Sequence, residues 1–268
     1  MKYGLHMPNI DARTLAELAH EGEAAGWDGL FVWDGIWGID AWVSLAAVAI
    51  RTERMRIGTI ITPPSRRRPW KLASEAVTLD HLSNGRFILP VGLGAPDTGF
   101  DKVGEETDRK TRAQMLDESL EIMTGLWRGQ PFSYEGHHYQ VRDVTFSPTP
   151  VQSPRIPIWV VGAWPRPKSM RRVIRYDGIL PEGIARPADL RQMKQYIETH
   201  RTETTPFDIV FQGDTPGDNP VKAAEIIRPW AEAGITWWLE AIWDKPMNRG
   251  GIEGMRARIK QGPPKLPD

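Results

Sequence analysis

The sequence predicts an α/β protein of the (β/α)8 TIM-barrel class. Short β-rich runs alternate with amphipathic helical runs along the chain, and eight strand–helix pairs can be counted. The 268 residues give each pair roughly 30 residues, which is the usual length of a unit in this barrel. No internal repeat or low-complexity segment competes with this pattern, so residues 1–268 are expected to form a single barrel domain.

The strands are expected where apolar and β-branched residues gather between turn signals. Pro90 lies inside the fourth of these runs. Because proline has no amide donor, it predicts a bulge or a strand edge at that point. The eight expected strands cover residues 3–8, 29–34, 56–63, 86–94, 156–164, 177–182, 207–213 and 236–243.

The helices are expected where apolar residues recur at helical spacing beside a start or stop signal. Thr14 and Glu17 have the spacing of a capping box that opens the first helix, and Gly26 stops it. Asn219 followed by Pro220 is a favourable start for the seventh helix. The expected helices cover residues 14–26, 41–53, 72–83, 109–128, 168–176, 188–201, 220–234 and 251–260.

Residues 131–157 interrupt the alternation. They alternate like a hairpin and then become rich in proline, after which the strand–helix pattern resumes at once. We therefore expect a short hairpin excursion, about residues 130–157, before the fifth strand. His137 and His138 lie in this hairpin without the further ligands that a metal ion needs, so a surface position is expected and no metal site is predicted.

The composition excludes several classes of function. Lys plus Arg and Asp plus Glu number 34 each, so nothing global indicates a nucleic acid or an anionic membrane as partner. There is no cysteine, which excludes disulfides and thiolate chemistry. The N-terminal residues lack a signal-peptide pattern and no apolar run reaches the length of a membrane span, so a cytoplasmic location is expected.

The fourth strand ends in Gly92-Leu-Gly94, which raises the question of a Rossmann dinucleotide site. Asp97 stands where the fingerprint needs a third small residue, and this unit is the fourth of the chain rather than the first. In a barrel the same glycines lie at the C-terminal mouth, where active sites form and a flat ligand can approach the backbone. Four of the 12 tryptophans are also expected near this mouth, as the walls of an aromatic pocket: Trp33, Trp37, Trp164 and Trp243.

Four residues are candidates for catalysis because they follow or end predicted strands. His6 is a candidate proton donor or a hydrogen-bonded core histidine, and Asp34 is a substrate ligand or base, or a capping residue. Glu182 and Glu240 end the sixth strand and lie in the eighth. As a pair they also suggest a glycoside hydrolase, whereas singly they suit salt bridges to arginine.

Four segments of the chain, in order, resemble the bacterial luciferase-like family of flavin-dependent oxidoreductases. They are residues 66–94, which begin RRRPWKLASEAVTLDHLSNGRF, residues 116–141, the proline-rich residues 148–163 and RYDGILPE at residues 175–182. The family fold is a TIM barrel, in agreement with the count of strand–helix pairs. Its members use FMN or the deazaflavin coenzyme F-420, and the resemblance implies that the flavin ring would lie at the barrel mouth.

The resemblance also implies which strand ends hold the cofactor. The end of the third strand commonly carries an unusual peptide bond behind the ring, and the start of the fifth helix would bind a phosphate, assisted by Arg166 and Arg172. The implied cofactor residues are Ile60, Ile61, Thr62, Leu93, Gly94, Ala95, Gly162, Ala163, Trp164, Lys168 and Ser169.

The chain departs from the family in two places. It has Asp34 but no histidine after the second strand, and Ala95 where some deazaflavin enzymes have glutamate. The resemblance therefore favours FMN as the cofactor, and hydride transfer or monooxygenation of a small organic substrate as the reaction. NAD(P)H or a flavin reductase is a possible electron source, and a homodimer is a possible assembly.

Three alternatives stay open. The run Arg66–Arg68 follows the third strand and would suit the acidic tail of coenzyme F-420, as in a deazaflavin-dependent reductase or dehydrogenase, or it is a solvated basic loop. A barrel hydrolase would use Glu182 and Glu240 without a redox cofactor. A flavin-binding relative without catalytic activity is the third.

Overall fold

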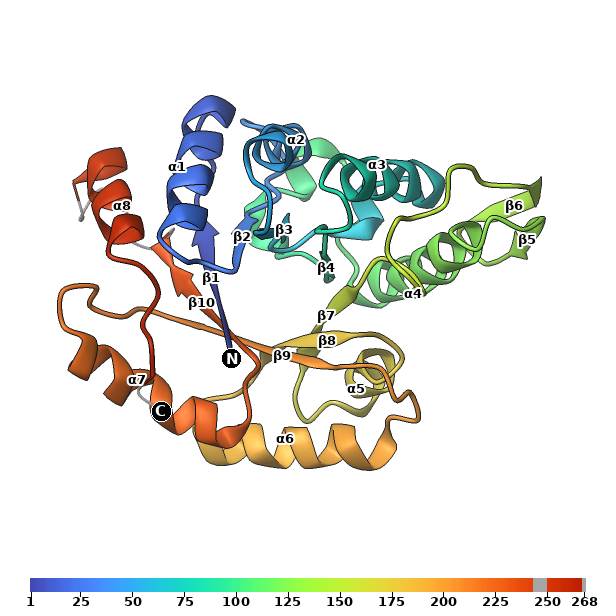
Figure 1. The fold of residues 1–268 in the computed structure, drawn as a ribbon. Coiled ribbons are helices and arrows are strands. Elements are labelled where there is room, and N and C mark those ends of the chain that lie inside the picture. The colour runs from blue at the N-terminus through green and yellow to red at the C-terminus, as the bar shows by residue number, and fades with distance from the viewer. Residues whose placement is uncertain (243–249, 267–268) are drawn as a thin grey trace.

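The structure of the protein is a computed structural model that describes residues 1–242 and 250–266. Eight parallel strands form one sheet in the order β3-β2-β1-β10-β9-β8-β7-β4. The sheet curves into a nearly closed barrel with the helices around its outside (Figure 1). The predicted (β/α)8 class is confirmed.

Each strand of the barrel overlaps a run predicted from the sequence, but the third and fourth end early. The third ends at Thr59 and the fourth at Val91, because the backbone beyond them leaves the ladder for the mouth loops. The predicted end of the last strand at Trp243 lies outside the described residues. The strands are β1 Lys2–Met7, β2 Gly29–Val32, β3 Arg56–Thr59, β4 Leu89–Val91, β7 Ile158–Ala163, β8 Gly178–Glu182, β9 Asp208–Gly213 and β10 Trp237–Ala241.

The helices follow the predicted pattern, with one correction at the first. Asp11 is its N-cap and accepts a hydrogen bond from the Thr14 amide at 3.0 Å, so the capping box predicted to begin at Thr14 is wrong. A carboxylate three residues earlier satisfies that amide and starts the helix sooner. Asn219 caps α7 as predicted. The helices are α1 Ala12–Ala24, α2 Ala41–Arg51, α3 Pro69–Leu82, α4 Arg109–Leu126, α5 Pro167–Val173, α6 Pro187–His200, α7 Pro220–Ala233 and α8 Gly251–Lys260.

The barrel closes between β3 and β4 through two isolated bridges, Ile57 with Phe87 and Thr62 with Val91. Pro90 lies on this seam, because its carbonyl accepts a hydrogen bond from the Thr62 amide at 3.0 Å. A strand residue directs its amide and its carbonyl to the same neighbour, so the missing donor of Pro90 faces the seam and not the ladder with β7. The predicted strand edge is confirmed.

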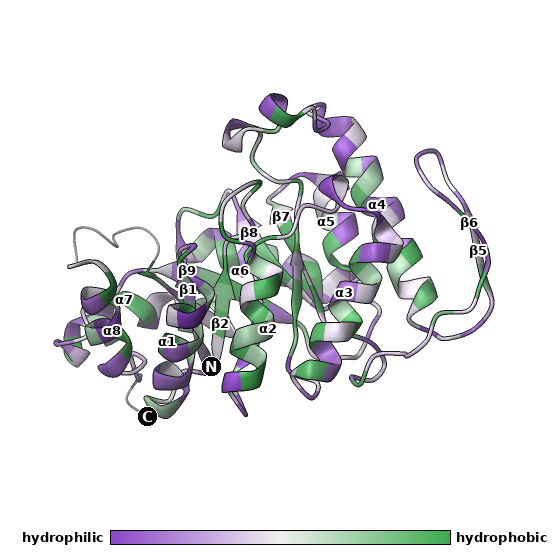
Figure 2. Ribbon diagram, turned by 90° about the horizontal axis from the view of Figure 1, so that it is seen from above, coloured by the Kyte–Doolittle hydropathy of each residue, from purple (hydrophilic) through white to green (hydrophobic). Residues whose placement is uncertain are grey.

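The interior of the barrel is filled with aromatic and aliphatic side chains. Trp159 lies 5.1 Å from Phe31 and 5.4 Å from Trp237, measured between ring centroids, and all three are fully buried. These tryptophans thus belong to the core of the barrel and not to a pocket. Figure 2 shows hydrophobic residues along the central strands and hydrophilic residues on the outer faces of the helices.

The predicted excursion is confirmed as an antiparallel hairpin of β5 Phe132–Glu135 and β6 Gln140–Val144. It projects away from the barrel (Figures 1 and 2). Glu118 of α4 holds its turn by accepting hydrogen bonds from the amides of His137, His138 and Tyr139, so the two histidines belong to a turn that packs on a helix. Across the described part of the chain, every helix is too short or too polar to cross a membrane.

Candidate functional site

A pocket of about 1200 Å³ opens at the carboxyl ends of the strands. Its walls come from the loops after β2, β3 and β4, from the carboxyl ends of β7 and β8, and from the adjoining faces of α4 and α5. The ends of β1, β9 and β10 contribute no lining residue within the described residues. The pocket is therefore off-centre, toward the seam between β3 and β4.

Small and aliphatic side chains line the inner wall of the pocket. Ile60 and Ile61 come from the end of β3, Leu93 from the loop after β4, and Val161 and Ala163 from β7. The Ile60–Ile61 peptide bond is cis, in agreement with the unusual peptide bond expected at this strand end. This wall suits one face of a flat, largely apolar ring.

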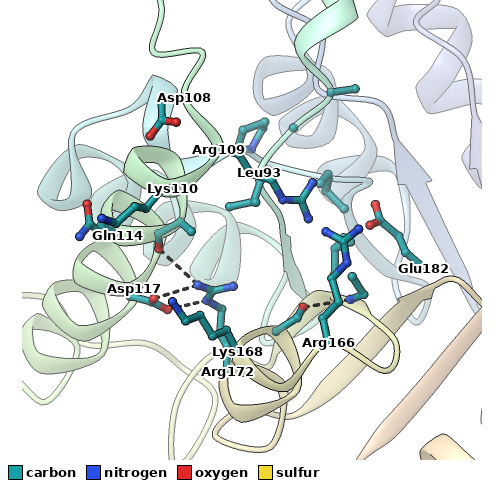
Figure 3. Close-up of a pocket in the computed structure, with 18 of the residues that line it drawn as sticks. Leu93, Asp108, Arg109, Lys110, Gln114, Asp117, Arg166, Lys168, Arg172 and Glu182 are labelled. Carbon is teal, nitrogen blue, oxygen red and sulfur yellow. Dashed lines mark hydrogen bonds and ion pairs between the residues drawn. The ribbon is translucent and has the colours of Figure 1, made fainter.

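Basic side chains dominate the outer part of the pocket, with seven Lys or Arg against four Asp or Glu. Arg172 of α5 is held by Asp117 of α4, with Nε–Oδ1 at 2.5 Å and Nη2–Oδ2 at 2.8 Å (Figure 3). Five of the basic side chains have no ion-pair partner among the described residues, and they form the cluster that we call the pocket cations. The pocket cations are Arg109, Lys110, Arg166, Lys168 and Arg171.

Asp34 is buried on the pocket wall and is engaged by the arginine run. Its carboxylate accepts from Arg67 at 3.3 Å, lies 3.5 Å from the Arg66 guanidinium, and receives the Trp42 indole N–H at 3.4 Å. Arg66 also donates to the Asp34 carbonyl at 2.7 Å. Two of the three arginines expected to suit an acidic cofactor tail are thus occupied in fixing the β2 and β3 loops.

His6 and Glu240 are not on the pocket wall, because they lie on β1 and β10. His6 is buried, its Nδ1 lies 3.0 Å from the Gln212 Oε1, and burial lowers its pKa to about 4. Glu240 is fully buried, accepts hydrogen bonds from Thr215 and Trp238, and lies 3.5 Å from the Arg258 guanidinium. Burial raises the pKa of Glu240. Its contacts give it a structural role.

Glu182 lies on the pocket wall, exposed at the end of β8 (Figure 3). It is therefore separated from Glu240, which points into the core, and the two do not form the carboxylate pair that a glycoside hydrolase needs. The geometry gives no support to the hydrolase alternative.

Eight of the eleven residues implied as cofactor ligands line the pocket, and three do not. The Thr62 hydroxyl is buried against the Thr59 hydroxyl at 2.8 Å. Gly162 faces the packing between β7 and its neighbours, since a Cβ there would lie 2.5 Å from Ile179. Trp164 packs on Tyr196, with 5.7 Å between ring centroids. The residues that do line it are Ile60, Ile61, Leu93, Gly94, Ala95, Ala163, Lys168 and Ser169.

The phosphate site expected at the start of α5 stays a prediction. The helix has only seven residues, and the Ser169 hydroxyl accepts a hydrogen bond from the Ala163 amide at 2.9 Å. Ser169 therefore ties the helix to the end of β7. The side chains of Arg166 and Lys168 line the pocket at this helix start and offer positive charge to an anion.

Of the three described tryptophans that were expected at the mouth, Trp33 lines the pocket, whereas Trp37 and Trp164 do not. Trp37 packs against Gly99, where a Cβ would lie 2.3 Å from the indole, and Trp243 lies outside the described residues. The face of α4 that carries Arg109, Lys110 and Gln114 was missed by sequence reasoning (Figure 3). The basic pair at the start of a helix that follows a mouth loop was the available signal.

The donor set suits a planar cofactor that carries an anionic tail. The aliphatic inner wall offers contact to a ring, and the pocket cations offer charge-assisted hydrogen bonds to phosphate or carboxylate oxygens. A pocket with this lining at the carboxyl end of a parallel barrel is typical of TIM-barrel enzymes that act through a bound cofactor.

The chain belongs to the luciferase-like monooxygenase family, whose sequence pattern matches residues 3–231. Among curated proteins, an uncharacterized protein of Mycobacterium tuberculosis is 35% identical over 196 residues, which are 73% of this chain and 57% of the relative. An F420-dependent glucose-6-phosphate dehydrogenase of Tsukamurella paurometabola is 32% identical over 187 residues, which are 64% of this chain and 52% of the relative. The matches thus span little more than half the length of these relatives.

Solved structures share the fold at low identity. An F420-dependent secondary alcohol dehydrogenase in complex with an F420-acetone adduct has a TM-score of 0.80 at 17% identity and covers 100% of this chain and 99% of its own. The FMN complex of a type II Baeyer–Villiger monooxygenase from Pseudomonas putida has a TM-score of 0.71 at 17% identity, covering 99% and 98%. Relatives of both cofactor types therefore share this architecture.

Proposed function

We propose that the protein is an oxidoreductase that uses the deazaflavin coenzyme F-420 to transfer hydride to or from a small organic substrate. The pocket cations carry this proposal. Five basic side chains without an ion-pair partner among the described residues supply more positive charge than the single phosphate of FMN requires, and they suit a longer acidic tail. The sequence alone ranked FMN first, and the charge of the pocket is our reason for now proposing F-420 first.

The aliphatic wall of Ile60, Ile61 and Leu93 would contact the ring, and Lys168 and Arg109 would hold the tail. When bound, the coenzyme supplies the hydride chemistry. The protein residues orient the ring and exclude water from one face of it. Glu182 and Asp34 are two of the four carboxylates on the pocket wall, and we assign to them the orientation of substrate.

Two titrations test the cofactor. Coenzyme F-420 and FMN are added separately to the protein, and binding is followed by quenching of cofactor fluorescence at several salt concentrations. We expect the Kd for F-420 to be lower than that for FMN, and the difference to shrink as salt screens the pocket cations. Tighter binding of FMN at every salt concentration would reject F-420, and binding of neither would reject the proposal as a whole.

A paired variant tests the role of the cations. The double substitution Arg166→Gln/Lys168→Gln should raise the Kd for F-420 about a hundredfold or more, since charge-assisted hydrogen bonds contribute roughly 1.5–3 kcal/mol each. The matched control, Arg128→Gln/Arg191→Gln, removes two exposed arginines that do not line the pocket and should leave the Kd unchanged.

The second candidate is an FMN-dependent monooxygenase, which the family and its FMN-bound structural neighbour favour. This candidate requires an electron source, NAD(P)H or a flavin reductase, and predicts oxygen consumption when reduced FMN is supplied. The third alternative, that the protein binds a flavin without catalytic activity, predicts tight binding of the flavin and no turnover. The substrate and a homodimeric assembly stay proposals, and sedimentation of the purified protein tests the latter.

A further inference from the structure

Arg112 of α4 is a buried cation without a carboxylate partner in the described part of the chain. It is 2% exposed, and its Nη1 donates to the carbonyl of Leu93 at 2.7 Å and to that of Gly94 at 3.0 Å. Its Nε is also buried and has no hydrogen-bond partner there. Removing a guanidinium from water with an incomplete set of partners is unfavourable. Arg112 is therefore not placed there by local stability alone.

Phe100 connects Arg112 to a second arginine of the mouth. The Arg112 guanidinium lies 5.2 Å from the centre of the Phe100 ring, and the Arg66 guanidinium lies 5.6 Å from it. Gly94 packs against the same ring, since a Cβ at Gly94 would lie 2.7 Å from the Phe100 Cζ. Because Arg66 is bonded to Asp34, this cluster joins the loops after β2, β3 and β4.

Arg86 shows what a buried arginine does where only the fold is at stake. It is 9% exposed and donates five hydrogen bonds, all to groups at the other end of the barrel, among them the carbonyls of Ala49, Met55 and Ser83. Each of its nitrogens has a partner. Arg112 donates fewer hydrogen bonds, and both of its acceptors lie in the backbone strip Leu93–Ala95, which lines the pocket.

We propose that Arg112 is a positioning residue of the cofactor site, which fixes the backbone of Leu93 and Gly94 so that this strip forms the wall against the ring. The assignment rests on the function proposed above for the pocket. Arg112 does not line the pocket, so it acts through the backbone that it holds and through Phe100.

Hydrogen exchange tests the positioning in the protein without cofactor. Arg112→Met keeps the length of the side chain and removes its donors, and it should accelerate amide exchange in residues 92–95 about tenfold or more relative to the wild type. The matched control is Arg86→Met, which should accelerate exchange near residues 49–55 and 83–86 and leave residues 92–95 unchanged. Unchanged exchange at residues 92–95 in Arg112→Met, or equal acceleration there in Arg86→Met, overturns the proposal.

Cofactor binding provides the second readout. Arg112→Met should raise the Kd for F-420 about tenfold and leave the salt dependence of that Kd unchanged, because Arg112 is shielded from solvent, whereas loss of Arg166 and Lys168 should reduce the salt dependence. Arg112→Lys keeps a cation that can reach one carbonyl, so it should bind F-420 more tightly than Arg112→Met does. If Arg112→Met does not fold, Arg112→Lys replaces it in both experiments. A Kd unchanged in Arg112→Met, or a reduced salt dependence, contradicts the positioning role. If the wild type binds neither cofactor, the proposed function fails and hydrogen exchange alone decides the role of Arg112.

Discussion

Asp117 of α4 and Arg172 of α5 form a two-point ion pair across the outer edge of the pocket. The Arg172 side chain is 10% exposed and the Asp117 side chain 42% exposed, so the pair lies between core and solvent. It connects two helices that are neighbours in space although the hairpin separates them in the sequence.

Asp117→Asn should affect stability and binding in opposite directions. Loss of the ion pair should lower the free energy of unfolding by about 1 kcal/mol. Removal of a negative charge from the rim should at the same time lower the Kd for an anionic cofactor, because Arg172 becomes available to it. Urea unfolding and fluorescence titration measure the two quantities, and weaker binding in this variant would show that the pair is needed to shape the pocket.

Gly94→Ala should be more damaging than an equivalent change at Gly104. Both glycines have φ of 73°, where a side chain costs roughly 1–2 kcal/mol. A Cβ at Gly94 would also lie 2.7 Å from Phe100 and 2.9 Å from Pro63, whereas a Cβ at Gly104 meets nothing within 4 Å. We expect Gly104→Ala to lose about 1 kcal/mol with the cofactor Kd intact, and Gly94→Ala to lose about 3 kcal/mol or more and the binding with it. Equal losses would remove the steric part of the explanation.

His6 should make the protein sensitive to mild acid. Burial lowers its pKa to about 4 in the folded state, below the value near 6.5 expected when unfolded, so the folded protein binds fewer protons. The stabilisation is complete above about pH 6.5 and is lost as the pH falls toward 4, by up to about 1.4 kcal/mol per pH unit. As the pH falls across that range, the free energy of unfolding of His6→Gln, measured with urea, should therefore rise relative to that of the wild type. A parallel pH dependence of the two proteins would disprove the assignment.

Glu240 and Glu182 should respond oppositely to substitution. Glu240→Ala removes a buried carboxylate that accepts hydrogen bonds from Thr215 and Trp238 and lies 3.5 Å from the Arg258 guanidinium, and it should lower the free energy of unfolding by about 3–5 kcal/mol. Glu182→Gln changes an exposed side chain and should alter stability by less than about 0.5 kcal/mol. Steady-state kinetics on the folded fraction should then show reduced kcat only for Glu182→Gln, and the reverse result would return Glu240 to the active site.

The architecture could be predicted from the sequence because it depends on local patterns. Strand and helix periods, Gly26 and Asn219 each carry their signal within a few residues. The strand edge at Pro90 could also be anticipated, as could the unusual peptide bond after the third strand, although that strand ends earlier than predicted.

The placement of side chains around the mouth could not be predicted in the same way. His6 lies at the end of β1 and Glu240 lies within β10, as expected. The pocket, however, is off-centre toward the seam between β3 and β4, and β1 and β10 lie on the opposite side of the barrel from that seam. The loops after β3 and β4 and the faces of α4 and α5 supply most of the lining residues of this off-centre pocket. The pairing of Asp34 with Arg66 and Arg67 likewise depends on loops that meet only after the barrel has closed.

Because the pairing between β3 and β4 is incomplete, we expect the folded state to gain stability when the proposed cofactor binds. Ile61 and Leu93 lie on opposite sides of this seam and line the same pocket. A molecule that contacts both therefore adds contacts across the seam, where two isolated bridges pair the strands. At a concentration a hundredfold above its Kd, such a molecule stabilises the native state by about 2.7 kcal/mol. Lifetime against proteolysis should therefore follow the abundance of the coenzyme.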